Sequence, residues 1–273
     1  MKTTITTLAI IVSIASSFAQ ETETKKDTTR VNFKNTELIL VQKPDHNEFE
    51  DDFPMDDTLN TPKEEDRPEA HWSGVDFGFG LNMNNAFGTN FNDNAYWEND
   101  PAKSTVWNLN IVEHKFNIAR EYFGITTGLG FNFTSVAFND NYILNSTSDS
   151  LYAFSDTVLT YSKNKLKASY LTVPLLLEFN TNMDADKSFY FATGVVGGIR
   201  MTSKIKRKGE LDGKEFVQKE KGTYSLNPFK LDAAVRMGYG SFGVFANYSL
   251  LPLFDTKKTV EVYPLTFGLS MNF

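Results

Sequence analysis

Six charged side chains fall on the polar faces of segments whose other face is apolar, and their types could support chemistry. They are Asp76, Glu178, Arg200, Lys230, Asp232 and Arg236. Both signs are present, and charges enclosed in a narrow low-dielectric interior cost several kcal/mol each unless they pair. We therefore expect a structural network of ion pairs. The alternative is a gated path for ions or protons along the same residues.

Catalysis would need different residues. Nucleophilic catalysis usually requires a histidine near a carboxylate or hydroxyl. The strand-rich part of the chain offers His114, whereas His46 and His71 fall in an acidic segment before it. The chain has no cysteine, and it shows no glycine-rich phosphate loop, metal-spaced cluster or nucleotide motif. We predict no enzyme, no cofactor and no metal, with a lipid-modifying enzyme using His114 as an alternative.

The elements that carry these residues are segments of period-two alternation, which is typical of strands. In the last of them, 261–273, apolar residues alternate with small or polar ones up to the aromatic terminal residue. About ten residues, rising ~3.3 Å each and tilted ~40°, cross a ~25 Å apolar band. From Trp72 onward there are eight such segments: 75–81, 107–111, 123–133, 171–179, 189–199, 229–239, 242–248 and 261–273. The phase of the second becomes unclear near Glu113.

The connections between these segments are sorted by length. Those after the first, third and fifth segments are long and polar, near 83–104, 135–165 and 202–227, whereas those after the second, fourth and sixth are short. Aromatic residues gather on the short-turn side (Phe123, Phe179, Phe189, Tyr239, Phe242, Phe273) and on the long-connection side (Trp107, Phe133, Phe229, Tyr248, Tyr263). Sorted connections and two aromatic belts are typical of outer-membrane barrels. We predict an all-β fold, an eight-stranded antiparallel transmembrane up-and-down β-barrel in the cell outer membrane; a soluble sandwich is the alternative.

The chain before this region has a different composition. Residues 1–19 have an early lysine, a short apolar run and small residues at the end, which predicts a cleaved secretory signal peptide. Residues 20–71 carry fifteen acidic and seven basic residues, so the net charge of −7 belongs to this acidic leader and 72–273 is nearly neutral. We expect the leader to be periplasmic and mostly disordered, apart from a strand-like run at 37–41. An acidic leader does not suit nucleic acid.

Three segments resemble a known family. Residues 169–179 (Ser-Tyr-Leu-Thr-Val-Pro-Leu-Leu-Leu-Glu-Phe), 191–198 (Phe-Ala-Thr-Gly-Val-Val-Gly-Gly) and 264–269 (Pro-Leu-Thr-Phe-Gly-Leu) are similar to strands of the PorT-like outer-membrane β-barrel families common in Bacteroidota. The resemblance covers 72–273. It implies an eight-stranded barrel inserted by the general barrel assembly machinery, with Phe273 as the C-terminal assembly signal.

Three functions follow as hypotheses. The first is a non-enzymatic barrel with a structural or interaction role, which displays long surface loops and a periplasmic tail. The second is a narrow channel or a component of a transport or secretion complex, and the third is the lipid-modifying enzyme. The connection at 202–227 is basic and would suit an anionic surface. Expected partners are outer-membrane lipid, lipopolysaccharide, the assembly machinery and a periplasmic partner of the leader.

Overall fold

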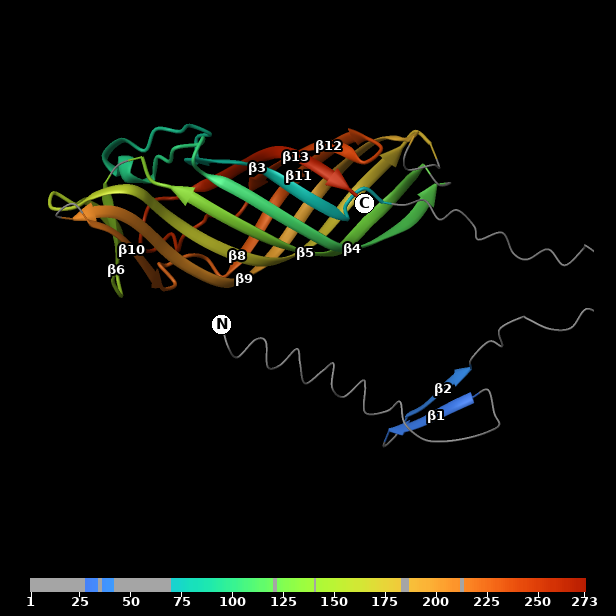
Figure 1. The fold of residues 1–273 in the computed structure, drawn as a ribbon. Coiled ribbons are helices and arrows are strands. Elements are labelled where there is room, and N and C mark those ends of the chain that lie inside the picture. Colours follow the sequence, from blue (N-terminus) through green and yellow to red (C-terminus); the bar gives the residue numbers. More distant parts are fainter. Residues whose placement is uncertain are drawn as a thin grey trace, which may run out of the picture. The chain divides into compact units, whose positions relative to one another are not determined.

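Eight strands close into a ring in the computed structural model, which describes residues 28–33, 36–41, 70–119, 122–139, 141–182, 187–211 and 214–273 (Figure 1). In chain order they are β3 (Gly74–Met83), β4 (Thr105–Ala119), β5 (Phe123–Ala137), β8 (Thr160–Asn180), β9 (Phe189–Leu211), β11 (Phe229–Tyr239), β12 (Phe242–Ser249) and β13 (Tyr263–Asn272). Each pairs antiparallel with its predecessor, and β13 pairs with β3 to close the ring. The predicted eight-stranded antiparallel barrel is confirmed.

The alternation seen in the sequence separates an apolar outside from a polar inside. On β8, the large apolar side chains Val173, Leu175, Leu177 and Phe179 all face outward and are about half exposed. Their neighbour Glu178 points inward and is fully buried. A band of exposed apolar side chains around a closed sheet is the surface that a bilayer covers.

The long connections are mostly strand rather than irregular loop. β8 and β9 stay paired well beyond the ring, as far as Thr160 opposite Glu210. β10 (Lys214–Lys221) then folds back onto β9. A further hairpin joins β6 (Tyr142–Ser146) to β7 (Leu151–Ser155). The expectation of loops over 135–165 and 202–227 is therefore wrong in form. Apolar residues such as Leu166 and Ile205 keep the alternation going within these polar segments, and both are buried.

These extensions share a hydrophobic core at the long-connection end. Trp97, at the end of the short 3-10 helix η1 (Asn92–Trp97), is 1% exposed, and its ring lies 4.4 Å from that of Phe254. The core draws on all the long connections: Phe91, Trp97, Phe138, Leu144, Leu151, Leu166, Ile205, Tyr224, Leu226, Phe254 and Val262. We call this cluster the outer cap. It gives this end of the barrel a packed structure of its own.

Two strands precede the barrel. β1 (Thr28–Phe33) and β2 (Thr36–Val41) pair antiparallel in a two-stranded sheet of their own. The strand-like run at 37–41 thus lies in β2, whereas the signal peptide and the leader residues outside β1 and β2, up to residue 69, lie outside the described residues. Among the described residues, no helix has the length and apolarity needed to cross a membrane.

Candidate functional site

The centre of the polar lumen is an ion pair between Asp76 of β3 and Arg236 of β11. The guanidinium donates twice, Nη1 to Oδ2 at 2.8 Å and Nη2 to Oδ1 at 2.9 Å. Both side chains are at most 2% exposed. β3 and β11 are not neighbours in the ring, so the pair reaches across the lumen. Such two-pronged arginine–carboxylate pairs are among the strongest hydrogen-bonded contacts in proteins.

Amide side chains complete the contacts of this pair. The Nδ2 groups of Asn108 and Asn110, both on β4, donate to Asp76 Oδ2 at 3.0 and 3.2 Å. Arg236 Nη2 also donates to Asn272 Oδ1 at 3.4 Å. Side chains from β3, β4, β11 and β13 therefore meet at this pair. The pair connects β11 to β3, two strands that do not pair through their backbones.

The chain just before β3 enters the lumen instead of leaving the barrel. Residues 70–73, which we call the lumen strap, are all buried. Glu113 Oε2 accepts hydrogen bonds from the backbone N–H groups of Trp72 and Ser73, at 2.8 and 2.6 Å. The Trp72 ring lies over the Arg236 guanidinium at 5.2 Å, a cation–π contact. The strap thus fills the lumen beside the central ion pair.

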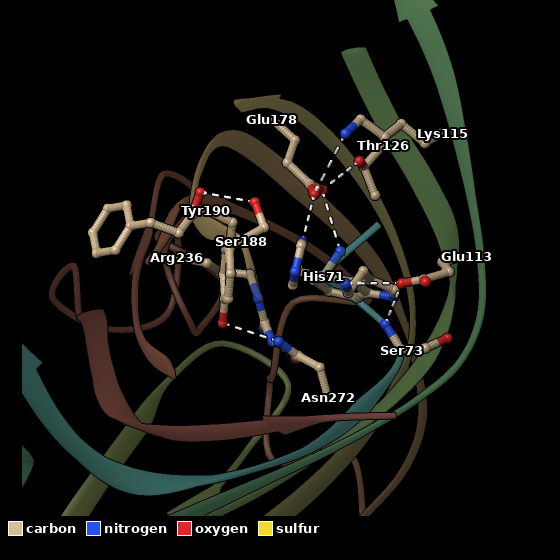
Figure 2. Close-up of polar contacts among 12 residues, drawn as sticks. His71, Ser73, Glu113, Lys115, Thr126, Glu178, Ser188, Tyr190, Arg236 and Asn272 are labelled. Carbon is tan, nitrogen blue, oxygen red and sulfur yellow. Dashed lines mark hydrogen bonds and ion pairs between the residues drawn. The ribbon is translucent and has the colours of Figure 1, made fainter. Parts of the chain in front are cut away.

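A second polar cluster holds the histidine of the strap (Figure 2). His71 Nδ1 lies 2.9 Å from Glu178 Oε1, and the imidazole stacks on the Tyr190 ring at 4.0 Å. Glu178 Oε2 accepts from the Thr126 hydroxyl at 2.6 Å, and Lys115 Nζ is 3.9 Å from Oε1. Burial alone would disfavour the charged carboxylate of Glu178; its three polar neighbours compensate.

This cluster does not have the order of a catalytic triad. A nucleophile must give its proton to the histidine, which a carboxylate then orients. Here the Thr126 hydroxyl donates to Glu178 rather than to His71. Within the part of the chain that the structure describes, no group of three or more His, Asp or Glu is placed to hold a metal ion. The contacts are those of a packed interior.

Two histidines lie in the described barrel region, and the prediction had placed one of them, His71, in the leader. His71 was assigned to the leader, but it lies inside the barrel and is 3% exposed. His114 sits on the outer face of β4, with its ring 4.5 Å from that of Phe116. The reason is a bulge in β4: pairing with β5 skips from Asn110 to Val112. One extra residue moves Glu113 and Lys115 to the lumen and His114 to the outside.

The remaining predicted charges lie in separate contacts. Lys230 Nζ is 3.0 Å from Asp232 Oδ2, and the Ser249 hydroxyl donates to Asp232 at 2.7 Å. Arg200 donates to the backbone carbonyls of Leu226 and Thr223. The six residues thus form one central pair, one peripheral pair, the Glu178 cluster and an arginine bound to the outer cap.

The sequence did not point to several members of the lumen. His71, Trp72 and Ser73 precede the first alternating segment, and Glu113 and Lys115 follow the bulge. A pair of consecutive apolar residues, Ile111 and Val112, is the one local sign that the phase changes there. For the strap, the only sign is an isolated tryptophan after a charged stretch.

The terminal aromatic residue lies at the same end of the barrel as the strap. The Phe273 side chain is 77% exposed, and its backbone N–H donates to the Ser73 carbonyl at 3.3 Å. Its role as an assembly signal stays a prediction.

Residues 62–258 match the family model described as "Outer membrane protein beta-barrel domain". No curated protein gives a significant match. Two solved structures of Ail, the attachment invasion locus protein of Yersinia pestis, are similar to this chain. The first, in complex with the heparin analogue sucrose octasulfate, is 13% identical with a TM-score of 0.30, covering 73% of this chain and 96% of that one. The second is 12% identical with a TM-score of 0.29, covering 74% and 99%.

Proposed function

We propose that this chain, which belongs to the outer membrane protein beta-barrel domain family, is a closed, non-enzymatic barrel with a structural or interaction role. Its working parts are then the strand extensions on the outside of the cell and the acidic leader in the periplasm. Barrels of this kind carry short turns on the periplasmic side and long connections outside. The finer assignment to PorT-like proteins rests on the resemblance of the three strand segments.

One observation carries this proposal: both ends of the lumen are filled. The lumen strap fills the short-turn end beside the Asp76–Arg236 pair, and the outer cap fills the other end. An eight-stranded barrel has an interior only wide enough for side chains even without such additions. A narrow channel would need these groups to move aside together.

Ion conductance tests the closed lumen. Purified protein in a planar bilayer is expected to show no large, steady conductance, and steps on the nanosiemens scale would contradict the proposal. A gel-mobility difference between unboiled and boiled samples shows that the barrel is folded. Arg236→Ala removes the central side chain; small currents from this variant would show that the ion pair helps to seal the lumen.

The leader needs a separate test, because we propose that it binds a periplasmic partner. Crosslinking in intact cells should compare the full chain with a variant lacking residues 20–69. The deletion must stop there, since His71 and Trp72 are part of the lumen. A crosslinked partner lost only in the deletion variant supports the proposal. Identical crosslinks from both chains would leave the extensions as the interacting part.

Non-enzymatic function is proposed from the lumen contacts and from the position of His114. The enzyme alternative assigns His114 as the base for hydrolysis or transfer of acyl groups of outer-membrane lipid. In that case His114→Ala should abolish the activity. Reproducible turnover by the purified parent, lost in this variant, would favour the enzyme instead.

A further inference from the structure

Eight lysines share one face of the extension formed by β8, β9 and β10. The pairing places Lys165 opposite Lys206, and Lys206 opposite Lys219; in the next row Lys167 faces Lys204, which faces Lys221. Side chains of directly paired residues lie on the same side of a sheet. The set, which we call the lysine face, is Lys163, Lys165, Lys167, Lys204, Lys206, Lys208, Lys219 and Lys221.

Few acidic groups balance this face. Lys208 Nζ lies 3.0 Å from Glu215 at the far edge, next to which Glu210 pairs with Glu215 across the strands. Glu220 is on the opposite side of β10 and contacts Arg207. The rows nearer to the barrel therefore hold lysine opposite lysine, an arrangement that destabilises a sheet unless an anion covers it.

Lys167, on the part of β8 beyond the lipid-facing band, shows this electrostatic strain. Its pKa is lowered by partial burial, and then by the charges of Lys206, Lys204, Lys163 and Lys219. A bound anion would relieve the repulsion. The same lysines that repel one another would then hold the ligand together.

The lysine face points in the same direction as the lipid-facing side of the barrel. Below it, Leu171 pairs with Ile199 on the outer surface. A bulge then lets β9 gain one residue relative to β8, between the Tyr170–Arg200 and Ser169–Thr202 pairs. Because of this extra residue, Lys204 points outward over the bilayer instead of inward with the outer cap.

The height of the lysines above the membrane follows from the aromatic belt. Phe133, an exposed belt residue, is paired with Ser169. Lys167 is the next outward-facing residue along β8, about 7 Å further at ~3.3 Å per residue. The first row of lysines is therefore level with lipid head groups, and the later rows rise above them.

A pocket adjoins the lysine face at this level. It has a volume of about 530 Å³, within the range of small-molecule sites, and its polar lining includes Lys103, Thr105, Asn139, Asn141, Lys163 and Lys165. Thr105 lies two residues beyond the belt residue Trp107 on β4. Lys165 donates to the Lys103 carbonyl, and Lys103 pairs with Asp100 at 2.8 Å. Two lysines of the face thus line a pocket that could hold a sugar.

We propose that the lysine face and this pocket bind the phosphorylated sugar head group of an outer-leaflet glycolipid. The phosphates contact the lysines and the sugar occupies the pocket. This inference deepens the proposed interaction role and rests on it, because the extension must lie on the outer side of the membrane. A lipid fits better than a soluble polyanion for two reasons. The lysines point outward on the same side of β8 and β9 as the lipid-facing residues, and the first row lies at the height of the lipid head groups.

The test is retention of lipid by the purified full-length barrel in neutral detergent, measured by native mass spectrometry. The probes are bis-phosphorylated lipid A, monophosphoryl lipid A, phosphatidylcholine, inorganic phosphate and heparin. The variant is Lys165→Gln, Lys167→Gln and Lys206→Gln combined. Its matched control, Lys214→Gln, Lys257→Gln and Lys258→Gln, removes the same charge away from the face.

The parent and the control are expected to retain bis-phosphorylated lipid A best, with weaker retention of the monophosphoryl form. A lysine near an anionic surface contributes about fivefold in affinity, so the three-lysine variant should lose tenfold or more. Equal losses in variant and control would overturn the site. Heparin bound as tightly as the lipid, and lost in the same variant, would overturn the lipid as ligand. Conductance of the same preparations reports separately on the closed lumen.

Discussion

Replacing either member of the Asp76–Arg236 pair should destabilise the barrel, and the two costs should not add when both members are replaced. Arg236→Met keeps the apolar stem against Trp72 but leaves Asp76 charged, buried and without its cation. Breaking a buried pair by removing one partner costs about 3–5 kcal/mol. The reverse change, Asp76→Leu, strands the guanidinium and should cost about the same. Both estimates follow from side chains that are at most 2% exposed.

The double variant removes both charges. Its remaining cost is the loss of an acceptor for Asn108 and Asn110, which now donate to Asp76. An unsatisfied buried donor costs about 1–3 kcal/mol. Asp76→Leu alone loses the same acceptor and also strands the guanidinium, so the double variant should be more stable than Asp76→Leu. Its cost should also be well below the sum of the two single costs.

Reversible urea unfolding of the barrel in lipid vesicles, followed by tryptophan fluorescence, measures these free energies. Lys103→Met is the control, because Lys103 is 71% exposed and its pair with Asp100 lies on the surface; it should leave the free energy of unfolding nearly unchanged. The reasoning is refuted if the two single variants cost less than about 1 kcal/mol. It is also refuted if their costs simply add in the double variant, since that would mean that the two charges do not depend on each other.

Other variants probe other parts of the molecule. Trp97→Ala should cost the outer cap about 3–5 kcal/mol and expose it to protease, while the gel mobility of the folded barrel stays unchanged; a global loss of folding would contradict a separate cap. The pKa of Asp156 is lowered by hydrogen bonds from the Leu159 backbone N–H and the Tyr161 hydroxyl. Because the folded-state pKa lies below the ordinary pKa of aspartate, ionised Asp156 stabilises the folded turn at pH values above that ordinary pKa. The stabilisation is lost as pH falls through the folded-state pKa. The protection factor of amides near this turn, which is the intrinsic exchange rate divided by the observed rate at the same pH, should therefore fall below about pH 4. Asp156→Asn should remove this pH dependence. Phe273→Ala should lower the amount of barrel assembled in cells but not refolding in detergent; equal losses in both assays would make the residue structural.

The fold was predictable because barrel strands expose their pattern directly in the sequence. The predicted segments 123–133 and 229–239 begin where β5 and β11 begin, and the latter also ends where β11 ends. The predicted ends were wrong where polar residues continue the alternation, as in β8 and β9. In these segments lysines alternate with apolar residues such as Leu166 and Ile205. They form strands because the apolar residues pack in a core that covers one face. Such a core exists in the outer cap, and it depends on contacts between segments far apart in the chain.

The lumen was only partly predictable. The sequence indicated that Asp76 and Arg236 point inward, but not that they meet, because β3 and β11 are separated by two strands in the ring. It also did not indicate that residues 70–73 turn into the lumen. Their burial depends on acceptors such as Glu113, which a bulge brings to the inside. Strand length and face follow from local pattern, whereas the partner of a charge follows from ring closure.

Two of the four register shifts in the ring strands that the structure describes connect these observations. Each appears in the sequence as an interruption of alternation: Ile111 with Val112 on β4, and Met201 with Thr202 on β9, all four of which are exposed. After the first, Glu113 and Lys115 point into the lumen, where they hold the strap and Glu178. After the second, Lys204 and Lys206 point over the bilayer. A one-residue shift exchanges the two faces of a strand, so in a closed barrel an added residue redirects every charge beyond it. The break on β4 therefore marks where charged side chains begin to fill the lumen. The break on β9 marks where lysines begin to face the surroundings of the barrel.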